Sequence, residues 1–277
     1  MKNYIFSISI LIASNFVFAQ GNASKIVLSN GQKIMMLSND TTNISQKRGE
    51  DNMDMKAFSS SKTEIEIITA EADGYKAIKT LKSIKINFDG FGQKMIYDSE
   101  DAKKQEGIMA DQLKNVLNKA DTILISNEGK LIEEDDKNDK AKKGKGGMIK
   151  MMNQGGGNVE NAFLVVPSDA KEGSGWKVDG TKDGVRSQTI YFVEKLDGNI
   201  ATLSFKKKTK GVTSHSGGQG GDIKVDLDNL SNGMLTVDLK TALVKRFYEN
   251  TDTKSKTTMM GQDIPSTGKV MTEVRFE

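Results

Sequence analysis

The stretch TEIEIITAEADGYKAIKTLKSIKINF, residues 63–88, decides the fold. On both sides of Asp73-Gly74, apolar and mostly β-branched residues alternate with polar or charged ones, which is typical of a half-buried strand. An Asp-Gly pair readily takes the positive φ angles of a tight hairpin turn. The stretch therefore predicts an antiparallel hairpin with strands over residues 63–68 and 77–88.

A second hairpin of the same kind lies in the C-terminal half. Residues 189–195 and 200–205 alternate in the same way around Asp197-Gly198. The repeated order suggests an internal duplication. We expect a mainly β fold of two related antiparallel β halves, a sandwich or an incomplete barrel sharing one core, with one or two short connecting helices.

Three further stretches complete this expectation. The Asn30-Gly31 pair predicts a hairpin between residues 25–28 and 33–37. The polar residues 38–49 predict a loop or a solvated edge strand. Met109, Leu113, Val116 and Leu117 then stand at positions i, i+4, i+7 and i+8, on one face of a helix, which predicts a helix over residues 108–118.

The N-terminus has the pattern of a secretory signal. Lys2 precedes a short apolar run, and the small residues Val17 and Ala19 stand at the −3 and −1 positions of a cleavage site. The run is shorter than the roughly 20 residues that cross a bilayer, so we expect no membrane span. We expect cleavage after Ala19 and a periplasmic or secreted protein. With no cysteine, the chain lacks disulfides and the lipid-attachment residue of a bacterial lipoprotein.

A low-complexity segment divides the mature chain. Residues 134–157 change from acidic to lysine-rich, and then to a stretch of Met and Gly. We therefore expect four parts: a signal peptide over residues 1–19, a first β half over 20–133, a Lys/Gly/Met linker over 134–157 and a second β half over 158–277.

Side chains that carry chemistry are few. His215 is the single histidine and stands beside a Gly-rich loop without a nucleophile motif, so we interpret it as a solvated loop residue. Thioethers suit Cu(I), but Met148, Met151 and Met152 have no accompanying histidine and are better explained as flexible filler. The net charge of +3 is spread evenly, which argues against a nucleic-acid partner. We expect no enzyme, no metal and no cofactor.

Several short pieces resemble a known family. Tyr97-Asp98-Ser99 lies mid-chain, and Pro167 followed by Gly173-Ser174-Gly175-Trp176 opens the second half. Together they resemble an uncharacterised family of exported, β-rich bacterial proteins, a domain of unknown function. Its members carry a Tyr-Asp-Ser piece and a Pro…Gly-Asp-x-Trp piece, with Ser174 here in the place of that Asp. The resemblance covers most of the mature chain and implies export and β architecture rather than an activity.

These motif residues also have a structural interpretation. Asp98 and Ser99 follow a strand and can bond the backbone of the turn beyond it. Trp176 opens a strand, where it is expected to anchor the sheet. We therefore assign structural roles to Tyr97, Asp98, Ser99, Gly173 and Trp176, and no catalytic, cofactor-binding or metal-binding role to any residue.

Two functions fit these observations. The first is an exported, non-enzymatic ligand-binding or carrier module for an apolar small molecule. The alternative is a structural or protein-interaction component of the cell envelope, with an envelope protein as its partner. A tightly filled sandwich without a cavity of roughly 300 Å³ would argue against the carrier. A cleft with converging carboxylates and shifted pKa values would instead indicate an enzyme.

Overall fold

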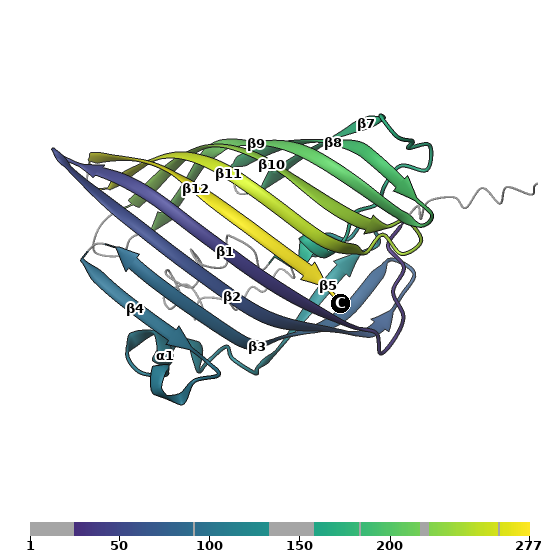
Figure 1. The fold of residues 1–277 in the computed structure, drawn as a ribbon, viewed down its shortest axis with the longest axis horizontal. Coiled ribbons are helices and arrows are strands. Elements are labelled where there is room, and N and C mark those ends of the chain that lie inside the picture. Colours follow the sequence, from purple (N-terminus) through teal and green to yellow (C-terminus); the bar gives the residue numbers. More distant parts are fainter. Residues whose placement is uncertain (1–24, 91, 133–157, 183, 217–221, 260) are drawn as a thin grey trace, which may run out of the picture.

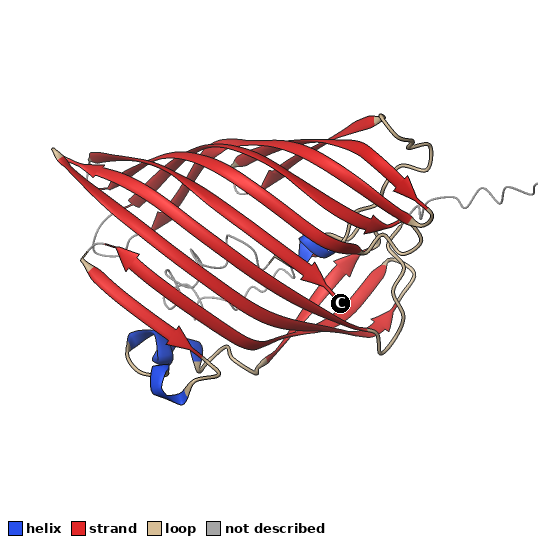
Figure 2. Cartoon of the chain, in the orientation of Figure 1, coloured by secondary structure: helices blue, strands red, loops and turns tan. Residues whose placement is uncertain are grey.

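The structure, a computed structural model, describes residues 25–90, 92–132, 158–182, 184–216, 222–259 and 261–277. The expected signal peptide and linker lie outside the described residues. The described chain forms one twelve-stranded sheet with a few short helical turns (Figures 1 and 2). Its strands are β1 (Lys33–Arg48), β2 (Asp51–Ala70), β3 (Gly74–Gly90), β4 (Gln93–Asp98), β5 (Ala120–Ser126), β6 (Leu131–Ile132), β7 (Gly175–Lys182), β8 (Val185–Asp197), β9 (Ile200–Ser216), β10 (Asp222–Asp238), β11 (Val244–Met259) and β12 (Gln262–Phe276). The helical turns are η1 (Ala102–Lys104), α1 (Ile108–Leu113) and η3 (Val159–Ala162).

The strands run in the order β6-β5-β3-β2-β1-β12-β11-β10-β9-β8-β7, and β4 pairs with β3 beside β5. Neighbouring strands are antiparallel, and β1 pairs with β12 in the middle of the sheet, where Met36 lies opposite Phe276. The sheet is curved and open, with β6 and β7 at the two ends of its path (Figure 1). The predicted mainly β fold is therefore confirmed, in the form of an incomplete barrel.

Both Asp-Gly hairpins are present. The first joins β2 to β3, and the second joins β8 to β9 with Gly198 at a φ of 59°. The strands on either side are longer than the predicted ones, because the alternation continues into stretches of Ser, Thr and Lys that carry little apolar signal.

Residues 25–28 do not form the predicted hairpin strand. The Asn-Gly turn is present, with Gly31 at a φ of 75°, but it leads only into β1. The Ile26 N–H donates to the carbonyl of Asn127 at 2.9 Å, and Ile26 and Leu28 are buried. The segment bonds to Asn127 and Thr241 instead of pairing with β1, and in this position its apolar side chains Ile26 and Leu28 enter the core.

Three other predictions also need correction. Residues 38–48 belong to β1, a central strand paired on both sides, rather than to a loop or an edge strand. The helix α1 ends at Leu113 instead of reaching residue 118. The backbone of His215 lies in β9 opposite Ile223 and not in a loop.

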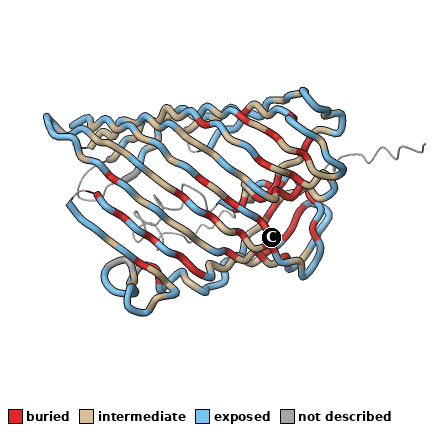
Figure 3. Tube along the Cα trace, viewed as in Figure 1, coloured by how far each residue is buried: buried red, intermediate tan, exposed pale blue. Residues whose placement is uncertain are grey.

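The core lies at one end of the curved sheet (Figure 3). Strands from both halves contribute to it, and the segment at 25–28 and η3 add the buried side chains of Ile26, Leu28, Val159 and Ala162. Its fully buried side chains include Ile34, Ile65, Ile67, Ile125, Leu203, Val237 and Val274. A smaller cluster packs α1 against β3 and β4 through Leu113, Ile86 and Tyr97. Among the described residues, the main core therefore occupies only one end of the concave face.

Candidate functional site

The two faces of the sheet differ sharply in charge. We call the face that carries the core the inner face; on β1 it bears the side chains at positions 34, 36, 38 and 40. Away from the core, the outer face is charged, with ion pairs between neighbouring strands such as Lys210–Asp228 and Lys256–Asp263. At the same distance from the core, the inner face carries mainly Ser, Thr, Gly and aliphatic residues, most of them partly exposed and a few, such as Ser231 and Thr189, buried. Beyond the core it is a concave surface with few charged side chains, among them Lys207 of β9 and Lys182 of β7.

At the border between the core and this surface, one inward-facing residue from each of ten neighbouring strands lies opposite the next, and we call this line of residues the polar row. The strand registers place its members opposite one another, from β4 at one edge to β7 at the other. In order they are Tyr97, Ile86, Ser59, Asp40, Thr272, Glu249, Gly233, Phe205, Tyr191 and Trp176. Two of the five predicted motif residues, Tyr97 and Trp176, thus lie at opposite ends of one row.

Asp40 is the buried carboxylate of the polar row. Its Oδ1 accepts a hydrogen bond from the Thr272 hydroxyl at 2.7 Å, and its Oδ2 accepts one from Ser38 at 3.1 Å. Ser59 supplies a third side-chain hydrogen bond. Only 8% of Asp40 is exposed, and burial raises the pKa of its carboxyl group although the three hydroxyls act in the opposite direction. The site therefore holds a buried carboxyl group whose two oxygens both accept hydrogen bonds from hydroxyl groups.

Glu249 is the second carboxylate of the row, on the other side of Thr272. Its Oε1 lies 3.8 Å from the ammonium of Lys207, which projects from the inner face of β9 in the next row. Burial, and more weakly the charge of Glu249, raises the pKa of Tyr191 to about 12, so its phenol is neutral at physiological pH. The charges of this region are thus paired with each other or accept hydrogen bonds.

Aromatic rings complete the row towards β7. Trp176 stacks on Tyr191 with ring centroids 5.1 Å apart, Tyr191 lies 6.0 Å from Phe205, and Phe205 stacks on Phe247. Gly233 makes this possible, because a Cβ atom there would lie 2.6 Å from the Phe205 ring. The aromatic stack forms one wall of the inner face.

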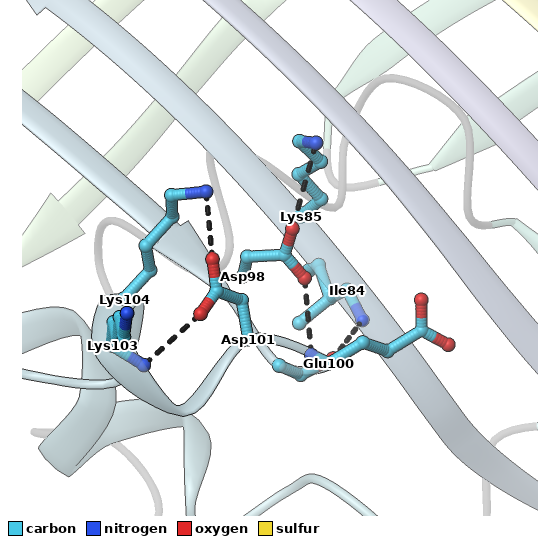
Figure 4. Close-up of polar contacts among 8 residues, drawn as sticks. Ile84, Lys85, Asp98, Glu100, Asp101, Lys103 and Lys104 are labelled. Carbon is cyan, nitrogen blue, oxygen red and sulfur yellow. Dashed lines mark hydrogen bonds and ion pairs between the residues drawn. The ribbon is translucent and has the colours of Figure 1, made fainter.

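The residues after Tyr97 form a hydrogen-bonded turn (Figure 4). The carboxylate of Asp98 accepts the N–H of Glu100 at 3.0 Å and lies 3.5 Å from the ammonium of Lys85. The hydroxyl of Ser99 accepts the N–H of Ile84 at 2.9 Å. These bonds end β4 and direct the chain towards η1. Asp98 and Ser99 therefore contact backbone groups and a lysine of the same sheet.

Gly173 and Ser174 form the turn that leads into β7. Gly173 has a φ of 79°, a region that side-chain-bearing residues rarely enter, and its N–H donates to the carbonyl of Val193 at 2.9 Å. The Ser174 hydroxyl accepts the N–H of Lys171 at 3.0 Å. A carboxylate, as the family pattern has at this position, can accept the same bond. The turn sets the start of β7 and hence the position of Trp176.

The described residues offer no ready metal site, since no group of three or more His, Asp or Glu side chains converges there. Two shallow hollows lie on the sheet. One of about 210 Å³ is lined by Met234, Tyr248 and Arg246 among others, and one of about 140 Å³ lies near Lys62 and Ser99. Both are smaller than the roughly 300 Å³ of a typical small-molecule pocket.

In the described part of the chain, no helix is long and apolar enough to cross a membrane.

Sequence reasoning identified the ends of the polar row and missed its centre. Asp40 stands in a polar stretch for which the sequence predicts a loop or a solvated edge strand, and Thr272, Glu249 and Lys207 belong to no local motif. The period-two pattern of Ser38, Asp40 and Thr42 was the available signal, because it places these polar residues on one face together with Ile34 and Met36.

Comparisons with known proteins support the fold more than any activity. The model of a family of unknown function, DUF6263, matches residues 73–244, and no curated protein matches. Among solved structures, a structure described as "Lipid-protein interactions in lipovitellin" is similar, with a TM-score of 0.51 and 11% identity over 91% of this chain and 25% of that one. This chain thus spans about a quarter of the lipovitellin chain. A Rh. blastica porin mutant (TM-score 0.25, 9% identity, 87% of this chain and 100% of that one) and an outer-membrane channel from Pseudomonas putida F1 (0.23, 7%, 92% and 98%) follow at much lower similarity.

Proposed function

The chain belongs to DUF6263, a family of unknown function, and we propose that it is an exported, non-enzymatic carrier that holds an apolar or amphipathic small molecule along the inner face of its sheet. The observation that carries the proposal is the segregation of charge between the two faces. Beyond the polar row, the inner face is built from residues such as Thr42, Ile44, Val270 and Leu227, while lysines and aspartates project from the outer face.

A concave surface with few charges suits the apolar chain of an amphiphile. Apolar groups leave water at a gain of roughly 25 cal/mol per Å² buried, and Ser and Thr hydroxyls in a sheet can satisfy each other without charge. The hydroxyls of Ser231 and Thr251, 2.8 Å apart, are such a pair on the inner face. Because the described hollows are small, we place the ligand on the open inner face rather than in an enclosed cavity.

The likeness to lipovitellin agrees with this proposal. That structure is described by its lipid–protein interactions, and the shared feature is the fold of a large curved sheet. The likeness adds no residue-level argument at 11% identity, so the proposal depends on the inner face of this chain.

The non-enzymatic part of the proposal depends on the state of the carboxylates. Asp40 accepts hydrogen bonds at both oxygens, and Glu249 lies beside Lys207, so neither group is left free to transfer a proton to a ligand.

Export is proposed from the N-terminal sequence alone. Mass spectrometry of the mature protein tests it, because cleavage after Ala19 leaves Gln20 as the first residue.

Adjacent substitutions on β12 test the carrier. Val270 faces inwards between Thr42 and Thr251, and its neighbour Met271 faces outwards and is exposed. Val270→Asp places a charge in the middle of the inner face, where a bound apolar ligand would have to desolvate it, whereas Met271→Asp adds the same charge to the outer face. We expect the first to weaken binding of an apolar fluorescent probe such as N-phenylnaphthylamine by about tenfold or more, a change of about 1.4 kcal/mol.

Met271→Asp is the matched control and should bind the probe as the unchanged protein does. Circular dichroism confirms that both variants fold. Equal affinity of both variants, or failure of the unchanged protein to bind the probe or any extracted lipid, would refute the carrier.

A further inference from the structure

The strand β7 is an exposed edge. In the described chain it pairs only with β8, in a regular register from Gly175 opposite Phe192 to Lys182 opposite Val185. It contains no proline and no bulge, two devices by which monomeric proteins protect an edge from pairing with another strand. Val178, at its middle, is 43% exposed although it is apolar. Its edge is thus able to accept a further strand.

The sequence of β7 is complementary to itself. In Gly175-Trp176-Lys177-Val178-Asp179-Gly180-Thr181, an antiparallel pairing centred on Val178 places Lys177 opposite Asp179 and Trp176 opposite Gly180. We propose that two copies of this chain form a dimer by antiparallel pairing of β7 with β7, with Val178 on the two-fold axis. Such an interface uses the same surface twice, which is the usual arrangement in homodimers. It would join the two sheets into one.

The charges support this partner over others. Lys177 and Asp179 lie on the outer face, where their side chains are half exposed and 3.0 Å apart within one chain. In the proposed dimer, each lysine also faces the aspartate of the second copy, so four charges alternate in sign around the axis. A strand from an unrelated protein would need to match this order, and a second copy of β7 does so by symmetry.

The inner face is complementary in shape. Trp176 projects inwards and stacks on Tyr191, while Gly180 has no side chain and leaves room for a large ring opposite it. Val178 meets Val178 of the second copy, which removes two exposed apolar side chains from water. This inference is independent of the carrier proposal, because the pairing uses the edge of the sheet and leaves the middle of the inner face open.

The strand β4 is the competing edge. A pairing centred on Ile96 would also place Lys94 opposite Asp98. However, Asp98 already accepts the Glu100 N–H and lies beside Lys85, and β4 is two residues shorter than β7. The geometry therefore favours β7, and β4 provides the control.

Cysteine cross-linking tests the dimer and its register, because the chain has no cysteine of its own. Residues directly opposite in an antiparallel pair have Cα atoms about 4.5–5.5 Å apart, within the range that a disulfide bridges. We expect Val178→Cys to form a disulfide-linked dimer when copper phenanthroline is added as oxidant. Thr181→Cys and Ile96→Cys should stay monomeric on a non-reducing gel. Cross-linking through Ile96→Cys, or none through Val178→Cys, overturns the proposal.

Charge reversal gives a second measurement that involves no oxidation. Lys177→Asp and Asp179→Lys each bring like charges together across the axis, so analytical ultracentrifugation should show a shift from dimer to monomer. The double variant, with Lys177→Asp and Asp179→Lys together, restores opposite signs and should regain the dimer. A monomeric unchanged protein at all concentrations, or single variants that dimerise as before, would contradict the pairing.

Discussion

Removing the Asp40 carboxylate should destabilise the protein, and the loss should depend on pH in a defined direction. Asp40→Ala takes the acceptor away from the hydroxyls of Ser38 and Thr272, each only 2% exposed. Leaving the buried Ser38 hydroxyl without its acceptor costs about 1–3 kcal/mol, and the lost bond to Thr272 adds to this, so we expect Asp40→Ala to lose at least about 1–3 kcal/mol. Asp40→Asn keeps one carbonyl oxygen as acceptor, and the hydroxyls can turn to accept from its amide, so its loss should be much smaller.

The pH dependence follows from the raised pKa of Asp40. The folded protein holds the proton more tightly than the unfolded chain does, because burial disfavours the charged carboxylate. The stability that Asp40 contributes is therefore fully present below its ordinary pKa of 3.8 and is lost as pH rises through the raised folded value. The unchanged protein should lose stability relative to Asp40→Asn over that interval.

Urea unfolding followed by circular dichroism measures this difference. The unchanged protein and both variants are compared at a series of pH values from below 3.8 upwards, and subtracting the Asp40→Asn values cancels the titration of every other group. A difference that is flat, or that grows in favour of the unchanged protein with rising pH, would show that the carboxyl group is not held in the buried environment described above.

Three further substitutions test separate parts of the molecule by the same unfolding measurement. Ile26→Ala empties a fully buried position where the N-terminal segment covers the core, and should cost about 2–5 kcal/mol; a cost below about 1 kcal/mol would show that this segment does not cover the core. Ser99→Ala leaves the Ile84 N–H without its acceptor and should cost about 1 kcal/mol, with binding of an apolar probe unchanged. Gly233→Ala forces a methyl group against the backbone carbonyl of Tyr248 and the Phe205 ring, and should cost about 1–3 kcal/mol or more and alter the near-ultraviolet circular dichroism of the aromatic stack; an unchanged spectrum would refute the contact with the ring.

The parts of the fold that sequence predicted were those with a local cause. The turns at Asp73-Gly74 and Asp197-Gly198 and the alternation beside them depend only on neighbouring residues, so the hairpins β2–β3 and β8–β9 were predictable. The Asn30-Gly31 turn was also recognised, but whether a turn closes a hairpin depends on what lies beyond it. Here the Ile26 N–H donates to the carbonyl of Asn127, 101 positions away (127 − 26).

The centre of the candidate site was not predictable in this way. Asp40 is buried because β1 lies between β2 and β12, and its partner Thr272 is 232 residues away. A polar residue in a polar stretch is normally solvated, and only the register with a distant strand converts it into a buried, bonded group. By contrast, Tyr97 and Trp176 stand in short sequence pieces that resemble a known family, although their place in one row depends on nine successive strand pairings.

The central position of β1 next to β12 has a consequence for how the chain folds. Strands β1 to β3 and β7 to β12 can pair in sequence order from their tight turns, since consecutive strands are neighbours in the sheet. The pairing of Met36 with Phe276 instead joins the first of the described strands to the last, and among the described pairings it closes the longest loop. Contacts between residues so far apart in the sequence slow folding. Until β12 arrives, the edge of β1 stays unpaired, so we expect a chaperone or a rapid late step to protect that edge from aggregation.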